Sequence, residues 1–204
     1  MSNLVIAEHD QNSLKSSTLS AVTAALAIGG DVDILVCGKG ADDVAKSAAL
    51  VCGVSKVIHV DNEIYEHQLA ESVAPLVSEI GKTYSGILTP ATTTGKNLLP
   101  RVAALLDVSQ ISDIVNVKSN NVFQRPIYAG NAIATVESSD SIKVITVRAT
   151  AFSEAEVGEI AAPIEDVSLV FAQELSQFIS ERLSQSERPE LTSAGIIISG
   201  GRGM

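Results

Sequence analysis

One candidate for ligand chemistry lies near the end of the chain, in the stretch "SGGRG" at residues 199–203. The apolar stretch at 194–199 predicts a strand that leads into it. Glycines let a backbone approach a ligand closely, and an arginine can donate paired hydrogen bonds to a phosphate or stack on a ring. A polar chain end without a ligand is the alternative interpretation. The candidate binding residues are Ser199, Gly200, Gly201 and Arg202.

A second candidate is the loop Thr92–Lys96, which follows a predicted strand and opens a predicted helix. Open α/β sheets bind ligands at this position, and helix N-termini offer backbone N–H groups to anions. The loop is not a P-loop, because the first glycine is missing and Asn97 stands where a Ser or Thr would hold magnesium. A capped helix start with a solvated lysine explains the same residues.

A third candidate, "GKG" at residues 38–40, has the strand–G-x-G–helix order of a dinucleotide loop. Asp43 replaces the third glycine of that motif, and an acid there would repel a pyrophosphate. We therefore expect an ordinary β–α turn, and this break counts against an NAD-dependent dehydrogenase.

Catalytic and metal-binding patterns find little support. The three histidines are scattered, no G-x-S-x-G motif occurs, and no Cys/His ligand spacing is visible. Cys37, at the end of a predicted strand, and Cys52, inside a predicted helix, are both expected to be buried, reduced thiols. The acidic residues resemble solvated faces more than a catalytic pair.

Charge and composition exclude several classes of partner. The net charge of −10 disfavours nucleic acid and anionic membrane surfaces. No apolar run is long enough to span a membrane, so we expect no direct membrane insertion. The start "MSNLVIAEHD" lacks the pattern of a signal peptide or presequence. We expect a cytoplasmic bacterial protein or, alternatively, a processed form in the mitochondrial matrix.

The elements that must position these loops alternate in the first half of the chain. Strands of four to eight apolar residues alternate with longer helical patterns, which predicts a parallel sheet built from right-handed βαβ units. The last of these segments, the helix predicted at 97–107, is expected to hold Pro100 in or near its first turn. The predicted segments, from strand to helix in turn, are 3–9, 13–30, 31–38, 41–53, 56–61, 67–82, 86–90 and 97–107.

The second half changes character. Residues 111–119, 121–138 and 142–152 are β-rich and joined by turn compositions, which predicts antiparallel hairpins that extend the sheet. Residues 153–166 read as an acidic surface segment, and 172–185 as an amphipathic helix. A polar, Pro-containing linker at 186–190 predicts a domain boundary near residue 188.

Several stretches in order resemble the electron transfer flavoprotein α subunits. They are "TTGKNLLPRVAALLDVSQISDI", "IYAGNAIATV", "VRATAF" and "RPELTSAGIIISGGRGM". The resemblance covers the whole chain and implies a three-layer α/β/α fold with a mainly parallel sheet, like that of the adenine-nucleotide α-hydrolases. It divides the chain into an N-terminal α/β domain, residues 1–187, and a linker with the truncated start of an FAD-binding domain, residues 188–204.

The resemblance also implies a function. Such a subunit pairs with a β subunit and carries electrons on FAD from acyl-CoA and related dehydrogenases to a membrane quinone oxidoreductase, as in fatty acid β-oxidation. It is a carrier and not itself an enzyme. Ser199, Gly200, Gly201 and Arg202 match the family's first flavin contact, with Arg202 as the FAD-contacting arginine.

The remaining flavin contacts of the family lie beyond Met204, so the isolated chain is expected to purify without FAD. The N-terminal domain would then act as a platform for the β subunit. Arg125, Tyr128 and Asn131 have the chemistry of interface residues, although an ordinary hairpin explains them too. The alternative function is a stand-alone adenine-nucleotide-binding module that uses the Thr92–Lys96 loop.

Overall fold

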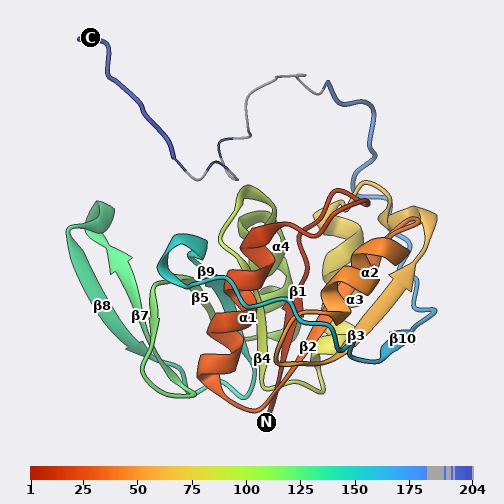
Figure 1. Ribbon diagram of the computed structural model, residues 1–204, viewed down its shortest axis with the longest axis horizontal. Coiled ribbons are helices and arrows are strands. Elements are labelled where there is room, and N and C mark those ends of the chain that lie inside the picture. Colours follow the sequence, from red (N-terminus) through yellow and green to blue (C-terminus); the bar gives the residue numbers. More distant parts are fainter. Residues whose placement is uncertain (183–190, 192–193, 195, 204) are drawn as a thin grey trace.

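The computed structural model describes residues 1–182, 191, 194 and 196–203. It contains four α-helices within these residues and two β-sheets (Figure 1). In chain order the elements are β1 (Ser2–Ile6), α1 (Ser16–Ile28), β2 (Asp31–Gly38), α2 (Asp42–Ala49), β3 (Val54–Asp61), α3 (Ala70–Gly81), β4 (Gly86–Pro90), α4 (Thr93–Leu106), β5 (Gln110–Ile114), β6 (Asn116–Val117), β7 (Val122–Ile127), β8 (Ala132–Glu137), β9 (Lys143–Val147) and β10 (Ile164–Asp166). Short 3₁₀ turns follow β3, β7 and β9.

The large sheet has seven parallel strands in the order β10-β3-β2-β1-β4-β9-β5. Helices cover both of its faces, so successive residues of a central strand enter two different cores. In β1, Val5 packs with α1 and α2, while Leu4 and Ile6 pack with α3 and α4. This two-sided burial explains why the central strands are continuous apolar runs. The predicted three-layer α/β/α fold with a mainly parallel sheet is confirmed.

An antiparallel hairpin is present as predicted, but it belongs to a separate small sheet with the order β6-β7-β8 and does not extend the large sheet. Phe123 of β7 is fully buried and joins the core under α1. The neighbouring β-rich segments differ from this pattern, because β5 and β9 pair in parallel within the large sheet. A register shift in β5 accompanies Asp113, which has a positive φ and pairs with the Arg148 guanidinium.

Helix α4 begins earlier than predicted. The side-chain oxygen of Thr92 accepts a hydrogen bond from the Gly95 N–H, so the helix starts at Thr93. Pro100 therefore lies about two turns inside the helix and not in its first turn, where the prediction placed it. Helix α2 ends at Ala49, before Cys52, which is exposed instead of buried. Cys37 is buried as expected.

Residues 153–166 do more than cover the surface. Their last three residues form β10, which pairs in parallel with β3 at the edge of the sheet. The ion pair between Lys56 and Glu165, at 2.8 Å, lies across this pairing. The acidic composition of the segment concealed this short edge strand.

The amphipathic helix expected at 172–185 is wrong for residues 172–182, which have no helical structure. Leu175 and Ile179 are each 82% exposed, whereas Phe178 stacks on His67 with ring centres 3.6 Å apart. An amphipathic helix gains most of its stability by packing its apolar face. Of the apolar side chains named here, only Phe178 packs on another residue, so a helix would gain little. Residues 183–185 lie outside the described residues.

The strand expected at 194–199 is also wrong where the structure describes it. Residues 194 and 196–199 form no strand, and Ile196 and Ile198 are exposed. A strand needs neighbours for its backbone hydrogen bonds, and Figure 1 draws this segment away from both sheets. The linker at 186–190 and the boundary near residue 188 lie outside the described residues.

Candidate functional site

The carboxyl ends of β1 and β4 form the natural ligand edge of the large sheet. The chain passes from β1 to β2 on one side, and β4 lies on the other side of β1. This reversal of strand order is where open α/β sheets bind ligands, because the loops after the two strands diverge there. We call this region the carboxyl edge; it consists of residues 7–15 after β1, residues 91–92 after β4, and the first turn of α4.

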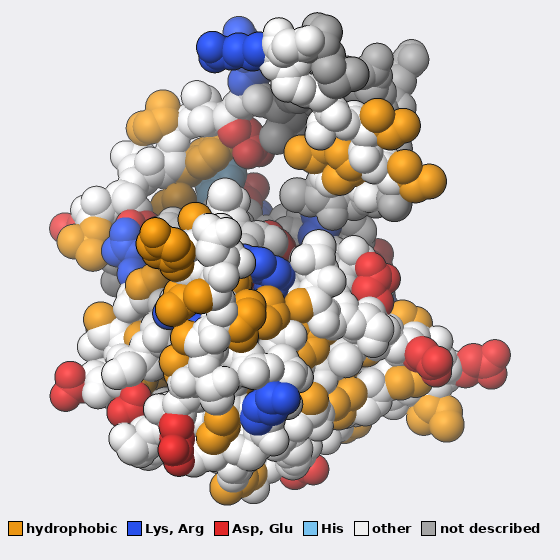
Figure 2. Space-filling model, turned by 90° about the vertical axis from the view of Figure 1, so that its left-hand side faces the viewer, with side chains coloured by type: hydrophobic (Ala, Val, Ile, Leu, Met, Phe, Trp, Pro, Cys, Tyr) orange, Lys and Arg blue, Asp and Glu red, His pale blue; other side chains and the backbone are white. Residues whose placement is uncertain are grey.

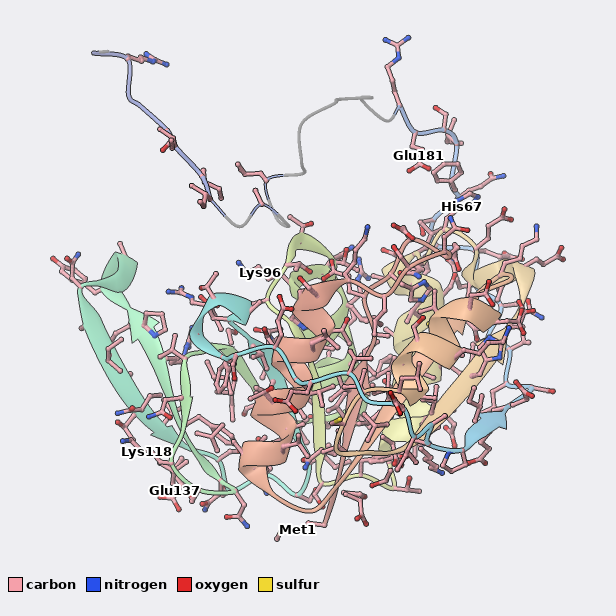
Figure 3. All side chains as sticks on the ribbon, in the orientation of Figure 1. Met1, His67, Lys96, Lys118, Glu137 and Glu181 are labelled. Atoms are coloured by element: carbon pink, nitrogen blue, oxygen red, sulfur yellow. The ribbon has the colours of Figure 1, made fainter. Side chains whose placement is uncertain are left out.

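The Thr92–Lys96 loop lies at this edge as expected, and the hydroxyl and carbonyl of Thr92 are used within the chain. The cap at Thr92 accepts the Gly95 N–H at 3.3 Å, and the Lys96 N–H donates to the Thr92 carbonyl at 2.9 Å. Gly95 is required because a Cβ there would lie 2.0 Å from the Pro90 carbonyl oxygen. The Lys96 side chain is exposed at the top of the domain (Figure 3). The geometry is that of a capped helix start with a solvated lysine.

A cavity of about 30 Å³ lies beside this loop, between the ends of β1 and β4. This space holds about one water molecule, far below the several hundred Å³ of a typical cofactor site. Three of its polar residues already have partners. Glu8 accepts from the Ser17 hydroxyl at 2.9 Å, Thr89 donates to the Ile6 carbonyl at 3.4 Å, and the Gln68 amide contacts His9. The polar lining residues are Glu8, Gln68, Thr89, Thr94 and Asn97.

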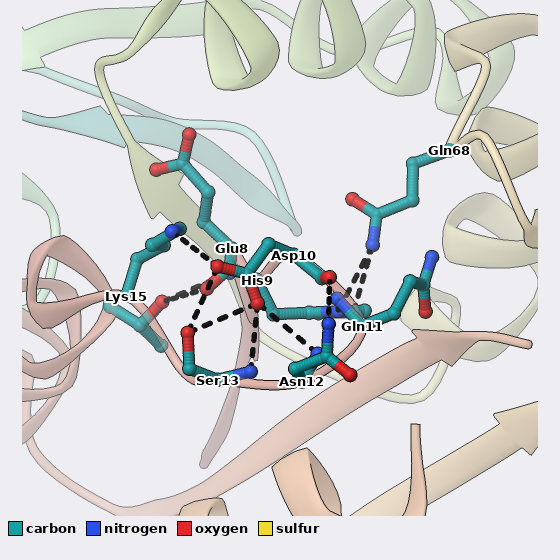
Figure 4. A network of polar contacts seen from close by, with 9 residues as sticks. Glu8, His9, Asp10, Gln11, Asn12, Ser13, Lys15 and Gln68 are labelled. Atoms are coloured by element: carbon teal, nitrogen blue, oxygen red, sulfur yellow. Dashed lines mark hydrogen bonds and ion pairs between the residues drawn. The ribbon is translucent and has the colours of Figure 1, made fainter. Parts of the chain in front are cut away.

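A network of polar contacts centred on His9 closes the carboxyl edge (Figure 4). His9 Nε2 lies 3.0 Å from the Cys37 carbonyl oxygen, and Nδ1 accepts from the Gln11 N–H at 3.2 Å. A neutral ring with its proton on Nε2 satisfies both contacts. The Gln68 side-chain nitrogen lies 3.2 Å from Nδ1 and 2.9 Å from Nε2, and it can donate only to the nitrogen without the proton, Nδ1. Burial lowers the pKa of His9 below its ordinary value, which keeps the ring neutral.

The loop after His9 is folded around Asp10. Its carboxylate accepts from the N–H groups of Asn12 and Ser13 and from the Ser13 hydroxyl, and it pairs with Lys15 at 2.6 Å. The hydrogen bond from Lys15, followed by those from Ser13 and Asn12, holds the pKa of Asp10 well below its usual range. These contacts explain how an exposed, strongly polar loop keeps one conformation.

The glycine turn after β2 does not offer a phosphate site. The Asp61 carboxylate accepts the Gly40 N–H at 2.9 Å, in the position where a pyrophosphate oxygen would bind. Lys39 beside it pairs with Glu66 at 2.9 Å. The turn is therefore closed by acids of this chain, in agreement with the prediction of an ordinary β–α turn.

The four predicted flavin-contacting residues, Ser199, Gly200, Gly201 and Arg202, are all exposed. Figure 3 draws their segment away from the carboxyl edge. A ligand of the size of FAD needs about 70–90% of its surface covered, and the described residues around Arg202 form no wall that could do so. By themselves, the residues that the structure describes do not fit an FAD site.

The histidines and cysteines offer no further site. Sequence reasoning left His9 among scattered histidines, and only the strand order brings it to Gln68; no local pattern signals this. Burial raises the pKa of the Cys37 thiol to about 12, so it is not a reactive thiolate. Among residues 1–182 and the described residues beyond them, no three His, Cys, Asp or Glu side chains could hold a metal ion, and no helix could cross a membrane.

Comparisons with known proteins agree with the fold. The family model of the electron transfer flavoprotein domain matches residues 3–172. The α subunit of the electron transfer flavoprotein of Pseudomonas aeruginosa is 57% identical over all 204 residues, which cover 66% of that protein. That of Bradyrhizobium diazoefficiens is 51% identical over the whole chain, with 65% covered.

A mitochondrial relative from Dictyostelium discoideum, also an electron transfer flavoprotein α subunit by name, is 48% identical over 98% of the chain and 61% of its own length. The chain thus spans somewhat less than two thirds of the length of these relatives. Because the family model covers most of the chain, from β1 to the segment after β10, the chain belongs to the electron transfer flavoprotein domain family.

Proposed function

We propose that this chain is the N-terminal part of an electron transfer flavoprotein α subunit and acts as the scaffold that pairs with a β subunit. The observation that carries this proposal is the identity of 57% over the whole chain, including residues 173–204 beyond the family model. The carboxyl edge supports a scaffold role, because His9 and Asp10 are hydrogen-bonded within the chain and the cavity beside them has room for only about one water molecule.

In this proposal the assembled flavoprotein carries electrons on FAD from acyl-CoA and related dehydrogenases to a quinone oxidoreductase of the membrane. The chain itself is a carrier subunit and not an enzyme. We place it in the bacterial cytoplasm, with the mitochondrial matrix as the alternative, since relatives of both kinds match it.

Flavin binding belongs to the complete subunit. We propose that Ser199, Gly200, Gly201 and Arg202 contact FAD there, with Arg202 donating to the ligand. The polypeptide of residues 1–204 alone does not retain FAD, because these residues are exposed and unsupported.

Co-expression with the β subunit of Pseudomonas aeruginosa tests the scaffold role. The 204-residue polypeptide should co-purify with that subunit as a 1:1 complex, and the polypeptide purified by itself should show no flavin absorbance. The Pseudomonas aeruginosa α subunit serves as the positive control for pairing. A polypeptide that ignores the β subunit while the control binds it would contradict the proposal, and stoichiometric flavin on the polypeptide alone would contradict the statement on FAD.

A stand-alone adenine-nucleotide module is the second candidate, favoured only by the position of the small cavity at the reversal of strand order. Calorimetry with AMP and ATP separates it from the scaffold role. Clear binding that is lost on substitution of Thr94 would support the nucleotide module, and absence of heat supports the scaffold.

A further inference from the structure

After β10 the chain runs up the outside of the domain to the level of the carboxyl edge (Figure 1). We call residues 167–178 of this segment the strap. The strap has no regular secondary structure, yet its residues alternate between partly buried and exposed from 167 to 173. Every second side chain therefore faces the domain, as in an extended strand that lies on one surface. The strap is nevertheless held in two different ways along its length.

The lower half of the strap, residues 167–171, is anchored in the core beside α3. Val167, Leu169 and Phe171 pack against the buried residues of that core. The hydroxyl of Tyr65, a fully buried residue, accepts from the Phe171 N–H and donates to the Leu169 carbonyl, both at 3.2 Å. One hydroxyl thus satisfies two backbone groups that have no neighbouring strand. The lower half can leave the domain only if apolar side chains leave the core.

The upper half of the strap, residues 172–178, is held more weakly. Within the described part of the chain, the hydrogen bonds that join it to the domain are made by side chains alone. The Gln173 amide donates to the Ser72 hydroxyl at 3.3 Å. The Ser176 hydroxyl donates to the Glu71 carboxylate at 3.1 Å. Hydrogen bonds at a surface contribute little net stability, because water offers the same groups equivalent partners.

The last contact of the strap is the stack of the Phe178 ring on the His67 ring. The ring centres are 3.6 Å apart and the ring planes are inclined by 12°. His67 lies on the loop before α3, and Figure 3 shows it at the same upper corner of the domain as Glu181. Directly after the stack, Ile179 is 82% exposed. The stack is the strongest apolar contact of the upper half, and it can open without disturbing the core.

The state of the stack sets how far the end of the chain can reach. Figure 2 shows the described end of the chain, at the top of the view, standing apart from the body of the domain. With the stack closed, the chain leaves the domain at Phe178. With the stack open, the next firm attachment is Phe171, so residues 172–178 join the free segment. An extended chain spans about 3.3–3.6 Å per residue, which lengthens the reach by up to about 25 Å.

We propose that the stack of Phe178 on His67 is a latch that opens while the domain stays folded and so lengthens the tether to the C-terminal residues. Closed, the latch keeps the upper half of the strap on the loop before α3 and the tether short. Open, it frees the upper half, while Tyr65 still holds the lower half. The consequence rests on the proposed function, because in a complete subunit the tether leads to the flavin-contacting residues 199–202.

The test follows backbone order along the strap by amide NMR relaxation of the 204-residue polypeptide. In the wild type, order parameters should stay near the rigid value of about 0.85 through residue 178, and relaxation dispersion should detect a minor open state on the microsecond-to-millisecond timescale. In Phe178→Ala, residues 172–178 should fall below about 0.6 and lose the dispersion, while residues 167–171 stay rigid. Ile179→Ala, at the exposed neighbouring position, is the matched control and should leave the wild-type profile unchanged.

Three results would overturn the latch: residues 172–178 already flexible in the wild type, a wild type without dispersion, or a Phe178→Ala profile equal to that of the wild type. Tyr65→Phe should loosen the lower half as well; should it unfold, the comparison of Phe178→Ala with Ile179→Ala still decides. Unchanged amide shifts in β1 and β4 verify that each variant is folded. The β subunit takes no part in these measurements, so a failed latch leaves the scaffold role standing, and failed co-purification overturns the scaffold role alone.

Discussion

The carboxyl edge and the outer half of the β7–β8 hairpin, which we call the outer hairpin (residues 125–134), both hold residues that sequence reasoning singled out, yet their side chains are used in opposite ways. At the carboxyl edge, His9 and Asp10 are satisfied within the chain, and Thr92 caps its own helix. In the outer hairpin, Arg125 Nε has no acceptor in the described part of the chain, and Tyr128 is exposed. Satisfied polar groups indicate structure, whereas the fold alone does not explain an exposed aromatic ring or an unpaired guanidinium N–H.

The largest expected effect comes from breaking the link between the hairpin and the core. Phe123→Ala removes a fully buried ring and should lower the free energy of unfolding by about 3–5 kcal/mol. Urea denaturation measures this loss. Ile133→Ala, on the outer hairpin, should cost less than about 1 kcal/mol, because its side chain is already half in water. Equal costs at the two positions would show that the outer hairpin is also part of the core.

The second effect concerns the carboxyl edge. In Gly95→Ala the new Cβ would lie 2.0 Å from the Pro90 carbonyl oxygen, so the backbone of α4 must shift. We expect a loss of about 1–3 kcal/mol, seen as a lower Tm. Thr93→Ala, at an exposed position of the same turn, should change stability by less than about 0.5 kcal/mol. If Gly95→Ala is as stable as the wild type, the start of α4 can move away from the Pro90 carbonyl, and such movement could open space for a ligand.

The parts of the fold that sequence predicts well are those that depend on local patterns. Central strands such as residues 31–38 are recognisable because burial on both faces demands continuous apolar residues, and Gly29 ends α1 with a φ of +94° that suits glycine. The cap at Thr92 is present, as one of the two interpretations of its loop expected, and ligand binding by the same loop stays a prediction.

The parts that sequence predicts poorly depend on distant partners. Strand β10 is short and acidic, and only its pairing with β3 makes it a strand. Residues 172–182 have a helical pattern but no complete surface to pack against, and residues 196–199 have a strand composition but no neighbouring strand. Likewise, the contacts of His9 come from β2 and from the loop before α3, far along the chain.

A third effect tests the satisfied network through its pH dependence. Burial lowers the pKa of His9 in the folded protein below its unfolded value of about 6.5, so the unfolded chain binds this proton first as the pH falls. The free energy of unfolding should therefore decline below about pH 6.5, by at most about 1.4 kcal/mol per pH unit, and be unaffected by His9 above it.

His9→Gln should remove this part of the slope, which urea denaturation at a series of pH values measures. Asp10, whose pKa is also lowered in the folded protein, is present in both proteins, so the difference between their stability curves isolates the effect of His9. Parallel stability curves for wild type and variant between pH 4.5 and 8 would show that His9 is not held neutral by the network. A network that is open to solvent would then be the better description of the carboxyl edge.

The smallest effect tests the strained tip of the outer hairpin. Ala129→Gly relieves a backbone conformation that costs alanine about 1–2 kcal/mol, but glycine also loses about 0.5–1 kcal/mol more conformational entropy on folding. The variant should therefore be as stable as the wild type or up to about 1 kcal/mol more stable in urea denaturation. Ala132→Gly, in the extended strand β8, carries the entropy cost without the relief and should be destabilised by about 0.5–1 kcal/mol. If both glycine variants lose stability equally, the tip is not strained, and Tyr128 is presented by an ordinary turn instead of one held at a cost to the fold.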